Sequence, residues 1–165
     1  MGAEGFVQRL ENGVETVIKW VVVTLLAVIC VNVFVQVILR YVFLYSSRWT
    51  LEVSRYMMIW AVLLAAGPAL KHGFLVGIDM VVEHLTPRTR IWIACLLRVV
   101  MGVLAGTILV QAIKLVQSQL EMEQMSPALE LPIGYMSMAL PVGLGVFLFF
   151  LAVMIYNDLL RLRRA

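Results

Sequence analysis

Charge is scarce in this 165-residue chain: Asp, Glu, Lys and Arg make up 14% of it, whereas hydrophobic residues make up 62%. A soluble domain of this size could not bury that much apolar surface. The chain also lacks a P-loop, a nucleophile motif, cysteines and histidines at metal-ligand spacing, and an acidic residue in the middle of any long apolar run. We therefore expect a membrane protein that is not an enzyme, holds no metal and has no cofactor of its own.

Cysteines are equally few, and the basic excess is small. Cys30 and Cys95 lie within apolar runs, so we interpret them as small buried hydrophobic residues, not as a disulfide. The net charge of +3 comes from basic residues at the ends of the apolar runs, where they set membrane topology and give no reason to expect nucleic acid. Their distribution predicts a multi-pass membrane protein with both termini in the cytoplasm.

What the chain does have is four long apolar runs, and a helix needs about 20 mainly apolar residues to cross a bilayer. Alternating ten-residue segments typical of membrane β-strands are absent from the sequence. We expect an all-α integral membrane protein with one four-helix domain over residues 1–165. Short amphipathic interfacial helices are expected before the first run and within 71–90. The predicted spans are 19–39, 49–70, 91–116 and 133–155.

A polar stripe runs along the first predicted span. Asn32, Gln36 and Arg40 follow one another at four-residue steps, so they share one helix face. Polar side chains that face lipid are costly, so this face should meet protein. The sequence leaves three alternatives open: packing within this chain, contact with a second protein, or an ion or substrate path.

A charged cluster precedes the second span. Arg48, Glu52 and Arg55 are spaced by four and three residues, which predicts one carboxylate between two guanidinium groups on one helix face. A carboxylate held in this way stays ionised and is a poor acid–base centre. We interpret the cluster as a partly buried set of ion pairs held by protein partners.

The third and fourth spans carry helix-packing signals. Gly102 and Gly106 form a GxxxG spacing that permits close helix contact. Pro141 should kink the fourth helix. Arg98 lies inside the third span, where it either extends to the cytoplasmic surface or reaches a polar partner.

Three blocks of sequence carry a family resemblance. The blocks are Leu39–Phe43 followed by Ser47, Trp49, Glu52, Arg55, Tyr56 and Trp60; Gly73, Asp79, Val82 and Glu83; and Ser126–Leu129, Leu131, Pro132 and Leu140–Gly143. Together they resemble the small membrane subunit of tripartite ATP-independent periplasmic (TRAP) transporters, the DctQ-like family, and this resemblance implies a place in the bacterial inner membrane. Leu51 stands where the family often has a first glutamate, and Leu75 and Gly77 replace a usual histidine and a common basic residue.

The resemblance implies a scaffold role. In that family a large, separate membrane subunit (DctM-like) binds substrate and sodium ions and moves them, and a periplasmic solute-binding protein (DctP-like) delivers a carboxylate-bearing solute. The small subunit would extend the fixed scaffold, contact membrane lipids and help to form the docking surface. The residues we expect at partner interfaces are Asn32, Gln36, Arg40, Tyr41, Arg48, Trp49, Glu52, Arg55, Trp60, Asp79 and Arg98.

Two other functions remain open at this point. The chain could be an autonomous small transporter that works as a homo-oligomer. It could instead be an assembly subunit of another inner-membrane complex.

Overall fold

A computed structural model describes residues 2–44, 48–72, 87–126 and 132–164. These residues form helices and contain no strand, only an isolated bridge between Met125 and Pro132. The predicted all-α fold is thus confirmed, while the interfacial helix expected within 71–90 falls mainly outside the described residues. The helices are α1 (Gly2–Tyr41), α2 (Arg48–Lys71), α4 (Pro87–Glu121), α5 (Ile133–Ser137) and α6 (Ala139–Arg164).

Among the described residues, four stretches are long and apolar enough to cross a membrane, and they contain the four predicted spans except for the start of the third. The first crossing helix extends beyond its predicted span because the amphipathic start is continuous with it in α1. At about 1.5 Å per residue, α1 is about 60 Å long, roughly twice the thickness of the hydrocarbon core. The four stretches are Arg9–Tyr41, Trp49–Lys71, Leu96–Glu121 and Ile133–Tyr156.

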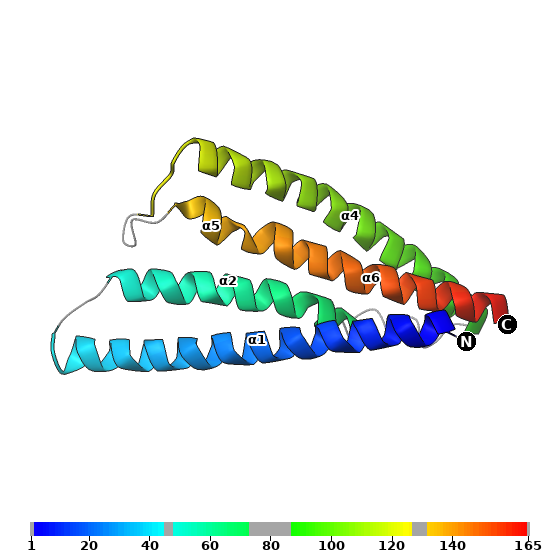
Figure 1. The fold of residues 1–165 in the computed structure, drawn as a ribbon, viewed down its shortest axis with the longest axis horizontal. Coiled ribbons are helices and arrows are strands. Elements are labelled where there is room, and N and C mark those ends of the chain that lie inside the picture. The colour runs from blue at the N-terminus through cyan, green and yellow to red at the C-terminus, as the bar shows by residue number, and fades with distance from the viewer. Residues whose placement is uncertain (1, 45–47, 73–86, 127–131, 165) are drawn as a thin grey trace.

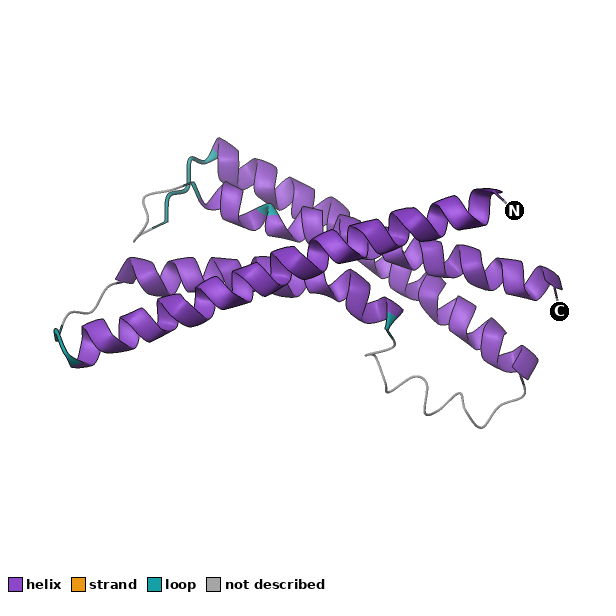
Figure 2. Ribbon diagram, turned by 60° about the horizontal axis from the view of Figure 1, so that its bottom comes forward, coloured by secondary structure: helices purple, strands orange, loops and turns teal. Residues whose placement is uncertain are grey.

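The long helices lie in a row in the order α1, α2, α6 and α4 (Figure 1). Helix α6 packs against both α2 and α4, and α1 packs mainly against α2. The short helix α5 contacts α4 and α6 near one end of these long helices. The chain termini lie near the opposite end of the long helices (Figure 1). A second view shows that α1 crosses the other helices obliquely (Figure 2).

The core lies along the two sides of α6. Phe150 and Leu151 are almost fully buried there, at 0% and 1% exposure. Glycines allow the helices to approach. A Cβ atom on Gly67 of α2 would lie 2.8 Å from the ring of Phe150, and one on Gly143 of α6 would lie 2.5 Å from Cβ of Leu63. The contact between α2 and α6 therefore depends on missing side chains at two positions.

Proline explains why the last span is interrupted. The expected kink at Pro141 takes the form of a break between α5 and α6 at Met138. Proline has no N–H to donate to the carbonyl four residues earlier, here that of Ser137, and its ring crowds that carbonyl. Helical bonding continues on either side, from Met138 N to Gly134 O (3.1 Å) and from Val142 N to Met138 O (3.2 Å).

The GxxxG spacing of α4 is used only in part within this chain. Gly102 faces α6, where a Cβ atom would lie 3.1 Å from a methyl group of Leu151, whereas Gly106 has nothing within 4 Å. Gly134 of α5 makes an unexpected close approach to α4, because a Cβ atom there would lie 2.6 Å from the side chain of Leu120. Cys30, expected to be buried, is exposed on α1 because that helix touches little besides α2.

The glycine contacts yield a matched test. Gly143→Ala should destabilise the protein by about 1–3 kcal/mol, because the new methyl group would push α2 and α6 apart. Gly145→Ala adds the same methyl group to the same helix, where nothing lies within 4 Å. It should be neutral or slightly stabilising, since alanine favours helix over glycine. Thermal unfolding in detergent measures both, and equal melting temperatures would contradict this account of the α2–α6 contact.

Candidate functional site

Polar contacts gather toward the two ends of the long helices. We call the end that lies away from the chain termini the outer end, and the contacts on that side begin with Asn32 of α1. Its side-chain amide donates hydrogen bonds to the hydroxyl of Ser54 (2.7 Å) and to the backbone carbonyl of Thr50 (3.1 Å) on α2. Thr50 is buried at 2% exposure. The first residue of the polar stripe is therefore satisfied by this chain's own second helix.

The other two residues of the stripe differ from Asn32. Gln36 is partly buried and Arg40 is exposed. Within the described residues, neither makes a side-chain hydrogen bond or an ion pair. Asn32 thus bonds within this chain, whereas Gln36 and Arg40, closer to the end of α1, keep hydrogen-bonding groups without a partner among the described residues.

Glu52 has a partner that the sequence did not suggest. Its carboxylate accepts a 2.5 Å hydrogen bond from the hydroxyl of Ser126, which is 2% exposed and follows α4. We expected Arg48 and Arg55 to pair with Glu52. Arg55 is exposed and, in the part of the chain that the structure describes, forms no ion pair with Glu52; the side chain of Arg48 is not described. A neutral hydroxyl thus contacts Glu52 where we expected Arg55, and the expected pairing with Arg48 lies outside the described side chains.

The segment that carries Ser126 is shaped by its backbone. Glu123 adopts a left-handed conformation with φ of 46°, which turns the chain after α4. Ile133 N then donates to Gln124 O at 2.8 Å, next to the bridge between Met125 and Pro132. This turn presents Ser126 to α2, so the Ser126–Glu52 contact joins the connection after α4 to the start of α2.

A second polar cluster joins the N-terminal part of α1 to the end of α2. Lys71 Nζ lies 2.7 Å from Glu15 Oε2 and 3.3 Å from Glu11 Oε1, and it donates to Asn12 Oδ1 at 3.1 Å. His72 Nε2 lies 2.6 Å from the other oxygen of Glu15. Glu11 is only 5% exposed, so Lys71 supplies charge to a carboxylate that water barely reaches. We call these residues the inner clip.

Sequence reasoning missed the inner clip. The available signal was Glu11 and Glu15 at a four-residue spacing on one helix face. Their partner is 56 residues beyond Glu15 along the chain, and local spacing cannot find it.

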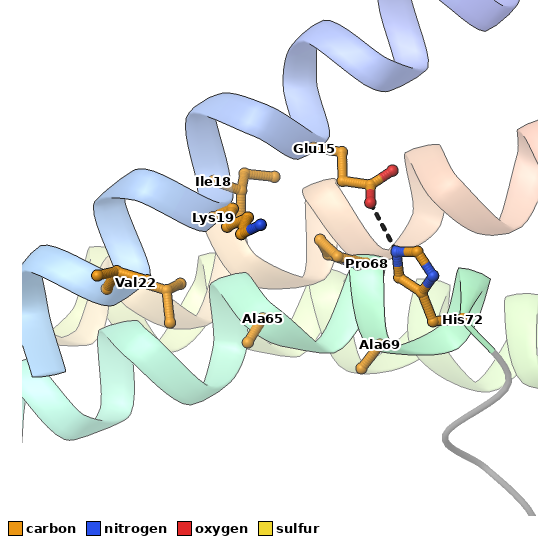
Figure 3. A pocket seen from close by; sticks show the side chains of 9 residues that line it. Glu15, Ile18, Lys19, Val22, Ala65, Pro68, Ala69 and His72 are labelled. Atoms are coloured by element: carbon orange, nitrogen blue, oxygen red, sulfur yellow. Dashed lines mark hydrogen bonds and ion pairs between the residues drawn. The ribbon is translucent and has the colours of Figure 1, made fainter.

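A groove of about 620 Å³ runs beside the inner clip between α1 and α2 (Figure 3). Its walls are mainly apolar, and Glu15 and His72 lie together at one end of it. The groove therefore combines an apolar wall with ionisable groups at one end. It is lined by Glu15, Ile18, Lys19, Val22, Val23, Ala65, Pro68, Ala69 and His72.

The remaining residues expected at partner interfaces lie apart from these clusters. Tyr41 and Trp49 are exposed at the outer end, at 74% and 51%, while Trp60 is partly buried in α2. Arg98 is partly buried in α4 and takes part in an interaction, so it is not free. Asp79 lies outside the described residues. Among the residues described, no group of three His, Cys, Asp or Glu side chains could hold a metal ion.

The fold and these contacts define a multi-pass helical membrane protein whose polar groups join helices near the two ends of the row. The family model of the DctQ component of tripartite ATP-independent periplasmic transporters matches residues 29–161. The chain belongs to this family and is a transporter component.

A curated relative agrees with that assignment. Over 146 residues, the chain is 32% identical to the isethionate TRAP transporter permease protein DctMQ of Oleidesulfovibrio alaskensis. The match covers 85% of this chain but 22% of the relative, so the chain spans about a fifth of that protein's length.

The Ser126–Glu52 contact can be tested by removing its donor. Ser126→Ala leaves a partly buried carboxylate without its hydroxyl partner and should cost about 1–3 kcal/mol of unfolding free energy. Ser118→Ala is the matched control, because the hydroxyl of Ser118 makes only a 3.9 Å contact with the sulfur of Met122. Unfolding by denaturing detergent in mixed micelles provides the comparison. If the two variants were equally stable, the contact would have no structural role.

The inner clip can be tested by removing its cation. Lys71→Met leaves Glu11 and Glu15 facing each other without a cation between them, so we expect a loss of roughly 1–3 kcal/mol, since the site is only partly shielded from water. Lys19→Met removes a neighbouring exposed lysine that forms no ion pair among the described residues. It should change the free energy of unfolding by less than about 0.5 kcal/mol. A larger loss from Lys19→Met would show that general charge balance matters more than the clip.

Proposed function

We propose that this chain is the non-catalytic scaffold subunit of a sodium-coupled TRAP importer of organic acids. It would support the large transport subunit and the docking of the periplasmic solute-binding protein. The observation that carries the scaffold role is the open row of helices. The most apolar window of α1, 18 residues long, has no buried residue, so the helices do not close into a bundle around it and the row keeps open edges.

The large membrane subunit is the main proposed partner. The name of the curated relative joins the M and Q components in one protein, and this chain matches only 22% of that length. The remainder is long enough for a large multi-spanning component. A covalent fusion keeps two chains together, which supports a lasting association between the corresponding separate subunits.

The transported solute is proposed to be a small organic anion. The relative's name specifies isethionate, which is such an anion. Substrate and sodium ions would bind in the large subunit, and this chain would contribute fixed structure only. The described residues agree with that division of roles, because their polar contacts join helices to one another.

The outer end of the row is the proposed docking side for the solute-binding protein. Both termini would lie in the cytoplasm and the chain in the inner membrane, which places the tip between α1 and α2 outside. Val42, Phe43 and Leu44 are strongly exposed there, at 70%, 67% and 88%, beside the exposed Arg40. An apolar tip with a nearby cation suits contact with a protein surface or with lipid headgroups.

The proposed function is tested by association and reconstitution. Tagged chain should co-purify in mild detergent with a large multi-spanning subunit. Liposomes that hold both subunits and receive the solute-binding protein should take up solute along a sodium gradient, whereas liposomes with this chain alone should not. Uptake by this chain alone would identify an autonomous transporter, and purification of this chain free of the large subunit would refute the scaffold role.

A further inference from the structure

Helix α4 carries a polar edge that points away from the rest of the molecule. Its buried residues, Ala105, Ala112 and Val116, face α6. At about 100° per residue, a second set of positions lies roughly half a turn from that buried face. This second set is Thr107, Gln111, Lys114 and Ser118, which we call the α4 edge stripe. Helix α4 is the last helix of the row (Figure 1), so positions opposite its buried face point outward.

Two members of the stripe find partners on α4 or in the turn directly after it. The hydroxyl of Thr107 donates to the carbonyl of Leu104 at 2.8 Å, and that of Ser118 lies 3.9 Å from the sulfur of Met122. Gln111 and Lys114 are both exposed, and across the described ranges neither makes a hydrogen bond or an ion pair. The unmet hydrogen-bonding capacity of the stripe is therefore concentrated in one amide and one ammonium group.

The two groups lie at different distances from the end of the apolar stretch Leu96–Glu121. Counted from the end of α4 at Glu121, Lys114 is about 10 Å and Gln111 about 15 Å along the helix. A long lysine side chain can extend toward the headgroups while its methylene stem stays in lipid. The shorter glutamine side chain cannot bridge the same distance. An amide in hydrocarbon without a partner is costly, so a hydrogen-bonding partner at Gln111 would stabilise the helix there.

The surface beside these groups has room for another segment. A groove of about 520 Å³ is lined by Ile108, Ala112, Leu115 and Leu140 in addition to Gln111 and Lys114. Apolar walls next to two hydrogen-bond donors suit a transmembrane helix that carries an acceptor. Small and polar residues are the usual means of helix association in lipid, where apolar contact alone gives little preference.

We propose that the α4 edge stripe is the surface on which a transmembrane helix of the large subunit docks, bringing a carboxylate or amide oxygen to Gln111 and Lys114. This inference rests on the proposed function and adds the place of contact.

The α1 edge is the weaker candidate. Asn32 is satisfied by α2, and Gln36 is partly buried rather than exposed. Arg40 lies in the last turn of α1, where its long side chain can reach the headgroups. The exposed neighbours Val31 and Phe34 are apolar and suit lipid.

Site-specific photo-crosslinking in membranes that hold the full transporter tests this placement. A benzophenone amino acid at position 111 should form an adduct with the large subunit, and the same probe at position 34 should label lipid only. The proposal is overturned if position 34 gives the protein adduct, or if position 111 labels lipid alone while the complex still purifies.

Substitutions add a second readout. Gln111→Leu should lower the amount of large subunit recovered with this chain about tenfold, the scale expected for one interhelical hydrogen bond in a membrane. Thr107→Val is the control and should leave recovery unchanged, because its hydroxyl bonds to its own helix. Equal recovery with Gln111→Leu and wild type would refute the docking surface alone. Failure of the wild-type chain to recover the large subunit would refute the proposed function itself.

Discussion

Close packing of α6 against α2 sets the architecture. Helices α2 and α6 lie so close at Gly143 and Leu63 that a side chain at position 143 would not fit. Gly67 leaves room in the same way for the ring of Phe150. Apolar surface gains little by leaving lipid for protein, so helices in a bilayer are held by this kind of contact and by hydrogen bonds. Helix α4 packs on the other side of α6, so α6 is the helix that joins the two halves of the row. Helix α1 is left with α2 as its main neighbour.

Helix α1 is held at two polar points with matching positions. Asn32 meets Ser54 near the outer end, and Glu15 meets Lys71 at the inner end. The two points are 17 residues apart on each helix, about 25 Å along antiparallel axes. Equal spacing means that neither helix must slide or stretch to satisfy both contacts. A polar residue in lipid thus fixes the register of α1 and α2, whereas apolar contact would tolerate several registers.

The sequence predicted the spans and the all-α fold because both follow from composition and run length. It predicted less of the polar contacts. The four-residue spacing of the stripe indicated that Asn32 should face protein, and it does, but the partner came from this chain. Glu52 was expected to pair with arginines on its own helix, yet its partner is 74 residues away at Ser126. Such pairs form through the packing of α6 and the turn after α4, which local spacing does not record.

An open row suits a membrane scaffold for a physical reason. In water, a single layer of apolar helices would expose two hydrophobic faces and would collapse into a closed bundle. In a bilayer, lipid chains cover those faces at little cost, so the chain need not close. Its few polar groups then fix the positions of the helices. Asn32 and the inner clip hold α1 against α2, and Ser126 holds the turn after α4 against α2. Gln111 and Lys114 are two of the polar groups on exposed surface that this internal arrangement leaves without a partner among the described residues. They therefore point to where the row meets a second protein.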